Sequence, residues 1–218
     1  FLVLLTRPVL YSSQNPIYML RYLFSALFSL FLFSACSQDL DSVQGLAIGD
    51  QAPLPTLQNE EGQSISLSEA LKKGPIVLVF YRGQWCPYCN RHLSALEAIR
   101  DSLEMEGAQL FAISPEKPEY LQEMQEKTEA GFSLLYDSAY QTIIAYNLAF
   151  LPSAGTRFKY NTILGARLSE AHGDERELLP VPATFLIDQE GIIRWRHFDP
   201  DYTQRSDPSE VLEALRAL

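Results

Sequence analysis

The stretch that decides the fold is residues 76–89, IVLVFYRGQWCPYC. The apolar run from Pro75 to Tyr81 is rich in β-branched residues and ends at the loop that contains Gly83, which is typical of a strand buried on both faces. Pro87 has no N–H and a fixed φ, so it suits the first position of a helix and makes Cys86 the cap. We therefore expect a buried strand, a short loop and a helix that begins at a Cys-x-x-Cys pair.

This placement predicts redox chemistry at the two cysteines. The free N–H groups and the positive dipole at the start of a helix stabilise a thiolate, so we expect a lowered pKa at Cys86. Residues three apart on a helix are close enough for a disulfide. Cys89 shares a helical face with Leu93 and Leu96, which indicates that it faces the core. The pattern predicts Cys86 as the attacking cysteine and Cys89 as the sheltered resolving cysteine.

Two other interpretations of the pair remain open. The cysteines could be structural, or they could be half of a zinc site that takes further ligands from His92, His172 and His197. His92 lies three residues after Cys89 on the predicted helix, and we expect it to be a surface residue rather than a ligand.

The remaining chain alternates strand and helix patterns. Helical spacing continues through Leu103 to Gly107, residues 151–180 form an irregular, partly helical excursion, and a β-hairpin spans residues 183–195. The other predicted elements are strands at 108–114 and 132–136, helices at 118–129 and up to Tyr146, and a last helix from Asp207 to Leu218. This order predicts an α/β domain with a central mixed sheet flanked by helices.

Composition excludes several classes. The chain has 218 residues, 47% of them hydrophobic, so it can bury a sizeable core. With 17 basic and 27 acidic residues it carries a net charge of −10, which argues against nucleic acid as a partner. Three cysteines cannot form the disulfide framework of a small secreted domain.

The N-terminal region resembles an export signal. Residues 22–35 are an apolar run too short to span a bilayer, Arg21 precedes it, and small residues lead to Cys36. This resembles a bacterial lipobox, so we expect Met19 to be the start, residues 1–35 to be removed, and Cys36 to be the lipid attachment site. A buried helix with an incidental cysteine is the alternative. We expect residues 36–47 to be a linker, residues 48–218 to form the domain, and the protein to be anchored in the bacterial cell envelope, outside the cytoplasm.

Three blocks of sequence together resemble a known family. They are residues 80–90, FYRGQWCPYCN, residues 179–188, LPVPATFLID, and residues 197–202, HFDPDY. They are similar to bacterial peroxiredoxin-like proteins of the alkyl hydroperoxide reductase/thiol-specific antioxidant family, within the thioredoxin superfamily. The resemblance implies a thioredoxin-like fold over residues 48–218, a substrate site at Tyr81, Trp85, Val181 and Pro182, and a cis peptide before Pro182. An ordinary trans proline is the alternative.

The sequence departs from this family at four positions. Typical peroxiredoxins carry a proline seven residues and a threonine three residues before the attacking cysteine, and before Cys86 these positions are Val79 and Gly83. The usual arginine before the late strand is replaced by Pro182, and the buried aspartate of thioredoxins is replaced by Phe80. Arg82 could supply the missing positive charge, or it could be a solvated loop residue.

Three functions are compatible with these residues. The first is a peroxidase that reduces hydroperoxides through Cys86, Cys89 and Arg82 and is recycled by a thioredoxin-like donor, with no metal or cofactor. The second is a membrane-tethered thiol–disulfide oxidoreductase acting on exported proteins. The third is a copper-carrying lipoprotein that uses both cysteines and one distant histidine.

Overall fold

A computed structural model describes residues 40–218, which lie within one compact unit. The described strands form a seven-stranded sheet in the order β2-β1-β5-β4-β3-β8-β9. Strands β3 (Ile76–Phe80), β4 (Gln109–Ser114) and β5 (Ser133–Tyr136) pair in parallel, and β8 (Ala183–Ile187) and β9 (Ile193–Phe198) continue the sheet antiparallel. The predicted mixed sheet is confirmed.

Strand β3 lies inside the sheet and is buried along its whole length. Successive side chains of a strand point to opposite faces. Val77, Val79 and Tyr81 enter one hydrophobic core, whereas Leu78 and Phe80 enter the other. The continuous apolar run seen in the sequence is therefore the consequence of cores on both faces.

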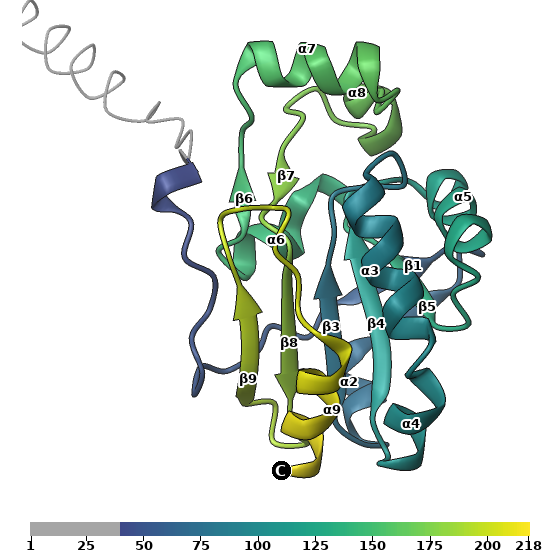
Figure 1. Cartoon of the computed structure of the whole chain (residues 1–218), viewed down its shortest axis with the longest axis vertical. Coiled ribbons are helices and arrows are strands. Elements are labelled where there is room, and N and C mark those ends of the chain that lie inside the picture. The colour runs from purple at the N-terminus through teal and green to yellow at the C-terminus, as the bar shows by residue number, and fades with distance from the viewer. Residues whose placement is uncertain (1–39) are drawn as a thin grey trace, which may run out of the picture. The chain divides into compact units, whose positions relative to one another are not determined.

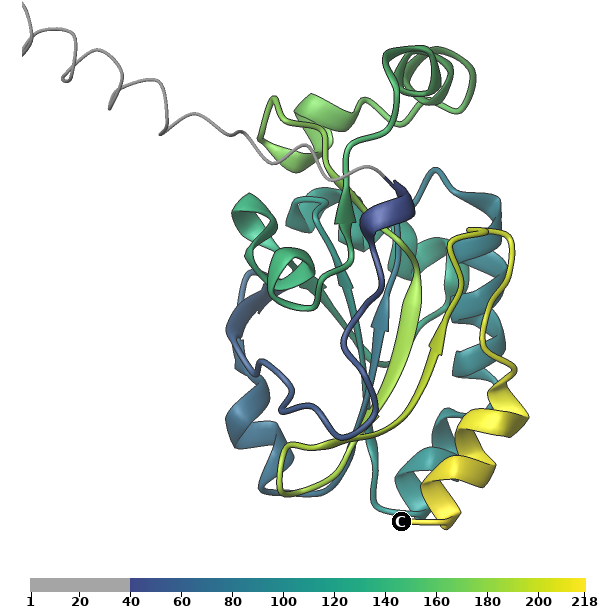
Figure 2. The same cartoon turned by 90° about the vertical axis from the view of Figure 1, so that its left-hand side faces the viewer.

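Helices cover both of these faces, as the two perpendicular views show (Figures 1 and 2). On one face lie α3 (Pro87–Glu97), α4 (Arg100–Met105), α5 (Pro118–Thr128) and α9 (Pro208–Arg216). On the other lie α2 (Leu67–Leu71) and α6 (Gln141–Ala145), the latter preceded by the 3₁₀ turn η2 (Ser138–Tyr140).

The predicted long helix after Cys86 is two helices. Ile99, between α3 and α4, has φ −110° and ψ 3°, outside the helical range. The apolar spacing continues across this break because α4 packs on the same face of the sheet, with Leu103 in the same core as Leu96. Hydrophobic periodicity alone therefore concealed the break.

The excursion at residues 151–180 is more regular than its sequence indicates. It contains α7 (Ala154–Ile163) and α8 (Leu168–His172), and the short strands β6 (Ala149–Phe150) and β7 (Leu179–Pro180) pair at its base. Figures 1 and 2 both show α7 and α8 standing beyond the end of the main sheet.

No helix or strand was predicted from sequence in the N-terminal part of the domain. Strands β1 (Thr56–Asn59) and β2 (Ser64–Ser66) form one edge of the sheet, and η1 (Leu40–Ser42) begins the described chain. Part of the predicted linker packs on the domain, because the amides of Gly45 and Leu46 donate to the carbonyls of Asn147 and Tyr146. Within residues 40–218 no helix has the length and apolar character needed to cross a bilayer.

Candidate active site

Cys86 and Cys89 lie one turn apart at the start of α3, and both are free thiols. Cys86 is the N-cap and Pro87 is the first helical residue, as predicted. The amides of Cys89 and Asn90 donate to the carbonyl of Cys86 at 3.0 and 3.1 Å. The side chain of Cys89 is fully buried, as expected, and Cys86 is only 1% exposed. Both sulfurs are thus shielded from bulk water.

The electrostatics of the pair reverse the prediction for Cys86. A hydrogen bond with Cys89, burial and the charge of Cys89 raise the pKa of Cys86, and Arg82 offsets this only in part. At Cys89 burial raises the pKa, but the hydrogen bond from Cys86 and the charges of Arg205 and Arg82 outweigh it and lower the pKa to about 5. The surroundings therefore favour the thiolate form at Cys89 over that at Cys86.

Arg82 is buried rather than solvated, with 1% exposure. Its guanidinium carbon lies 4.7 Å from the centre of the Trp85 ring, 4.5 Å from that of Tyr160 and 4.3 Å from that of Tyr202. Trp85 and Tyr160 also stack on each other, with ring centres 5.0 Å apart. Aromatic faces attract cations. The three rings hold a positive charge beside the cysteines, while Nε and Nη2 of Arg82 have no hydrogen-bond partner.

A second arginine reaches the pair from the far end of the chain. Nη2 of Arg205 lies 3.8 Å from Sγ of Cys89, 116 residues away in sequence. The next residue, Ser206, is buried and shares hydrogen bonds with Nε2 of His92 at 2.8 Å and with the hydroxyl of Thr184 at 3.0 Å. The sequence analysis did not identify Arg205, because no local pattern links it to Cys89.

His92 is therefore not a surface residue. It is 7% exposed, and burial lowers its pKa to about 3, with the charge of Arg205 adding to this effect. The reason is helical geometry: a residue three positions after a core-facing cysteine lies on the same face.

A buried carboxyl group, Glu116, lies next to the pair, after β4. Its Oε2 accepts the N–H of Gln84 at 2.7 Å, and its Oε1 has no partner. Burial raises the pKa of Glu116 well above its usual range; the Gln84 N–H opposes this and the charge of Cys89 adds to it. The position of the buried thioredoxin aspartate, on β3, is occupied here by Phe80. The buried acid Glu116 lies instead just after β4, the strand that pairs with β3.

There is no room for a side chain at Gly83, the position where the sequence analysis looked for the peroxiredoxin threonine. A Cβ atom there would lie 2.4 Å from Nε1 of Trp85 and 2.5 Å from Oε1 of Glu116. Tyr81, on the same segment, is buried, and burial raises the pKa of its hydroxyl, with the charges of Glu116 and Cys89 adding to the effect. Burial thus disfavours the charged forms of both Tyr81 and Glu116 near the cysteines.

The predicted cis peptide before Pro182 is wrong: residues 40–218 contain no cis peptide bond. The trans form is the intrinsically favoured one even before proline. Here the amide of Val181 extends the β6–β7 pairing by donating to the carbonyl of Leu148 at 2.8 Å. Val181 and Pro182 line a cavity of about 240 Å³ together with Tyr160 and Tyr202, two rings that pack on Arg82.

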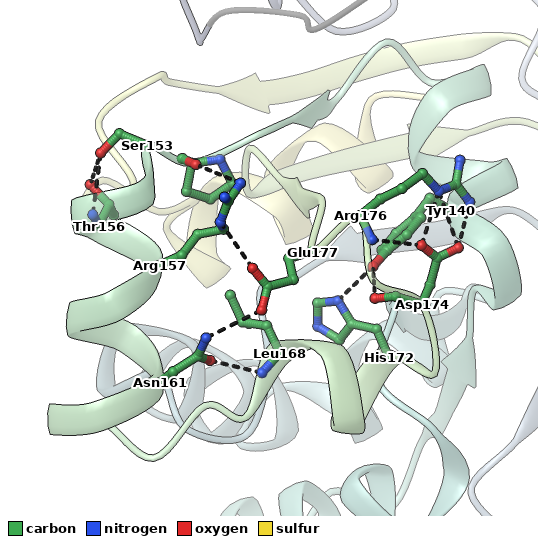
Figure 3. Close-up of polar contacts among 11 residues, drawn as sticks. Tyr140, Ser153, Thr156, Arg157, Asn161, Leu168, His172, Asp174, Arg176 and Glu177 are labelled. Carbon is green, nitrogen blue, oxygen red and sulfur yellow. Dashed lines mark hydrogen bonds and ion pairs between the residues drawn. The ribbon is translucent and has the colours of Figure 1, made fainter. Parts of the chain in front are cut away.

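Helix α7 carries Tyr160. A polar network holds α7 together with α8 (Figure 3). Oδ1 of Asn161 accepts the N–H of Leu168 at 2.8 Å, and its Nδ2 donates to Glu177 at 3.2 Å. Glu177 also pairs with Nε of Arg157 at 2.9 Å. The network positions the helix whose Tyr160 ring closes over Arg82.

The remaining predicted groups are placed as follows. His172 is buried and shares a hydrogen bond with the hydroxyl of Tyr140 at 3.1 Å (Figure 3). No three His, Cys, Asp or Glu side chains of residues 40–218 gather in a way that could hold a metal ion. Cys36 lies outside the described residues.

The fold and the site together define a thioredoxin-like protein with a buried dithiol at the start of the helix after a central strand. The family model described as AhpC/TSA family matches residues 48–196, and the chain belongs to this family. The family resemblance inferred from the three sequence blocks is thereby confirmed.

Individual relatives agree with this assignment. The chain is 34% identical to "Peroxiredoxin Bcp" of Escherichia coli K12 over 97 residues, which is 44% of this chain and 61% of that protein. It is 29% identical to "Thiol-disulfide oxidoreductase ResA" of Halalkalibacterium halodurans over 106 residues, 48% of this chain and 59% of the relative. The matched regions thus span about 60% of these relatives.

A solved structure shows the same fold. Peroxidoxin BcpB from Mycobacterium tuberculosis superposes with a TM-score of 0.63 and 19% identity, covering 79% of this chain and 98% of that one. The predicted thioredoxin-like fold is confirmed.

Proposed function

We propose that this protein is a thiol peroxidase that reduces hydroperoxides with the Cys86–Cys89 pair. The observation that carries the proposal is the pair of free, buried thiols with a guanidinium beside them, Nη2 of Arg205 lying 3.8 Å from Sγ of Cys89. A thiolate, not a thiol, attacks the peroxide oxygen, and nearby positive charge keeps it ionised at neutral pH. Membership of the AhpC/TSA family supports the same activity.

In the proposed cycle one thiolate becomes a sulfenic acid and the other cysteine condenses with it to a disulfide. The sequence places the attack at Cys86 and the resolving step at Cys89, whereas the charges around the sulfurs favour the reverse order. A thioredoxin-like dithiol donor would then reduce the disulfide and restore the pair.

Stopped-flow oxidation of the reduced protein by hydrogen peroxide tests this function. We expect oxidation far faster than that of free cysteine, with one disulfide formed per protein. The variant Cys36→Ala is the matched control and should keep the full rate. A rate no higher than that of free cysteine in the wild-type protein would falsify the peroxidase proposal.

A thiol–disulfide oxidoreductase acting on exported proteins is the alternative, and the similarity to ResA is the observation in its favour. The burial of both sulfurs argues against it, because a small peroxide reaches a covered thiolate more easily than a protein disulfide does. Reduction of a model protein disulfide faster than hydrogen peroxide would favour the alternative.

We also propose that Cys36 carries a lipid that tethers the protein to the outer side of a bacterial membrane. The apolar run, Arg21 and the small residues before Cys36 support this. Metabolic labelling with a palmitate analogue should mark the wild-type chain and fail in Cys36→Ala. Labelling that persists in the variant would contradict the proposal.

A further inference from the structure

Helix α7 and the residues next to it carry apolar side chains that the domain leaves uncovered. Phe158 and Ile163 are 69% and 70% exposed. Of the nine large hydrophobic side chains that are exposed in residues 40–218, four lie within residues 151–164: Leu151, Phe158, Ile163 and Leu164. The other five come from separate segments of the chain. Single exposed hydrophobic residues are ordinary, whereas a cluster of them marks a site of interaction.

The helix has an outward and an inward face. Tyr160 lies on the inward face and packs over Arg82. Spacings of three and four residues place four exposed side chains together on the outward face: Phe158, Lys159, Thr162 and Ile163. No residue of α7 is fully buried, and the helix stands beyond the end of the main sheet (Figures 1 and 2). The outward face is therefore open to a partner.

This part of the chain is basic, although the protein is acidic. The whole chain has a net charge of −10, but residues 151–169 contain no acidic residue and three basic ones: Arg157, Lys159 and Arg167. Arg157 pairs with Glu177 and Arg167 with Glu170, whereas Lys159 pairs with no acidic group in the described part of the chain. A helix with basic and exposed apolar side chains is typical of a surface that binds an anionic membrane.

The start of the described chain lies beside the same helix. Leu40 lines the cavity of about 240 Å³ together with Leu151 and Thr156, at the beginning of α7. Cys36, the proposed lipid attachment site, precedes Leu40 by four residues, and four extended residues span at most about 14 Å. A lipid at Cys36 would hold α7 close to the bilayer surface. At such a high effective concentration even a small patch can bind.

We propose that the outward face of α7, formed by Phe158, Lys159 and Ile163, docks on an anionic lipid bilayer. The two apolar side chains enter the boundary between headgroups and acyl chains, and the ammonium group of the lysine contacts lipid phosphate. A second copy docking by the same face would bring like charges together, which favours lipid as the partner.

Docking in this way turns the redox site toward the bilayer. Tyr160, on the inward face of the docked helix, stacks on Trp85, the residue before Cys86. The surface is independent of the peroxidase function. The proposed lipid at Cys36 supports it only by bringing α7 to the membrane.

A tryptophan added to the outward face tests the contact with lipid. The full-length variants Phe158→Trp and Met105→Trp are purified from membranes and reconstituted into vesicles of phosphatidylcholine and phosphatidylglycerol, with or without brominated acyl chains. Met105 is the control, because it is 87% exposed on α4, at the opposite end of the sheet (Figure 1). The emission of the parent protein, which contains Trp85 and Trp195, is subtracted.

We expect brominated lipid to quench the added tryptophan of Phe158→Trp by about half, because a helix at the interface buries its apolar face about 5–10 Å deep. The added tryptophan of Met105→Trp should be unaffected. Absence of quenching in Phe158→Trp, or equal quenching in both variants, would overturn the proposal. The measurement uses no peroxide, and these outcomes hold whether or not labelling detects a lipid at Cys36, so the three proposals fail separately.

The basic side chain is tested by Lys159→Gln in the Phe158→Trp protein, against Lys72→Gln, which changes an exposed lysine that follows α2. On anionic vesicles Lys159→Gln should lower the ratio of quenched to unquenched protein about fivefold, the contribution of one lysine near such a surface. On phosphatidylcholine alone it should have no effect. Equal effects of Lys159→Gln and Lys72→Gln would exclude a specific contact of Lys159 with anionic headgroups.

A protein partner is the competing occupant. Sedimentation of Phe158→Asp, and its reduction by thioredoxin after oxidation, report whether this face binds a second copy or a dithiol donor. Loss of self-association or slower reduction in Phe158→Asp, together with an unquenched Phe158→Trp, would overturn the lipid proposal in favour of a protein-binding surface.

Discussion

Glu116 shows at the scale of one residue how the site controls charge. Its carboxyl group is fully buried, one oxygen accepts the Gln84 amide, and the other has no partner. Ionising it would place a second negative charge near the Cys89 thiolate. Burial disfavours this second charge by raising the pKa of Glu116.

This predicts a pH-dependent gain in stability for Glu116→Gln. The folded-state pKa of Glu116 is raised, so between about pH 4.5 and that higher pKa the folded state holds a proton that the unfolded state has lost. The free energy of unfolding of the wild type should therefore fall as pH rises through this window, by about 1.4 kcal/mol per pH unit. Urea unfolding measured at rising pH from about 4.5 should show the variant gaining on the wild type for as long as the folded wild type keeps this proton.

Glu60→Gln is the matched control for that measurement. Glu60 is also a buried carboxyl group, but Oε2 accepts the Leu134 amide at 2.9 Å and Oε1 accepts from Gln125 at 3.2 Å. The glutamine NH2 group would face one of these two donors and could not accept its hydrogen bond, so this variant should lose stability. If the difference in unfolding free energy between Glu116→Gln and the wild type stays constant at all pH values, the buried-proton interpretation is refuted.

At the scale of elements, α7 and α8 form a cover that contributes Tyr160 to the ring cluster around Arg82. Helix α7 has no fully buried residue, so its position depends on polar contacts rather than on a core of its own. Asn161 supplies two of these contacts, to Leu168 and to Glu177. The cover is therefore the part of the site most sensitive to a single polar substitution.

Asn161→Ala should loosen the cover without unfolding the domain. Loss of two hydrogen bonds corresponds to about 1–2 kcal/mol of local stability. Hydrogen–deuterium exchange should become faster in residues 154–172 and stay unchanged in α3, and peroxide oxidation should slow because Tyr160 no longer fixes Arg82. Thr162→Ala, whose hydroxyl bonds to the Phe158 carbonyl in the same helix, is the control. Faster exchange across the whole chain would contradict a local role.

At the scale of the whole molecule, two buried histidines each connect segments that lie far apart in the sequence. His92 joins α3 to the segment that carries Arg205, and His172 joins α8 to Tyr140 in η2. Burial lowers their pKa values to about 3 and about 4. Both are therefore neutral in the folded state at neutral pH.

These histidines should make the protein sensitive to acid. Because their folded-state pKa values lie below the unfolded value of about 6.5, the unfolded state binds more protons as pH falls below 6.5. Stability present above pH 6.5 should be lost toward pH 4, by about 1.4 kcal/mol per pH unit for each histidine. Urea unfolding of the oxidised protein, which removes the thiol titrations, should show a shallower loss in His172→Gln. An equal loss in both proteins would contradict the prediction for His172.

The sequence anticipated the elements that local patterns encode. The strand at β3, the cap at Cys86, the proline at the first position of α3 and the hairpin of β8 and β9 all follow from neighbouring residues. It did not anticipate the break between α3 and α4, because helices on the same face of a sheet share one apolar spacing. The short strands β1 and β2 were missed because they lie at the sheet edge and expose much of their surface.

For the active site, the features that the sequence determined differ in physical origin from those that only the tertiary structure decided. The sequence by itself determined that two cysteines sit at the start of a helix behind a buried strand, because caps and apolar periodicity act over a few residues. The tertiary structure alone decided which groups surround the two sulfurs, because burial and contacts with residues far along the chain arise only on folding. Arg205 reaches Cys89 across 116 residues, and Glu116 reaches Gln84 across 32. No local pattern encodes these contacts; only the packing of β4, β9 and α3 around one point creates them.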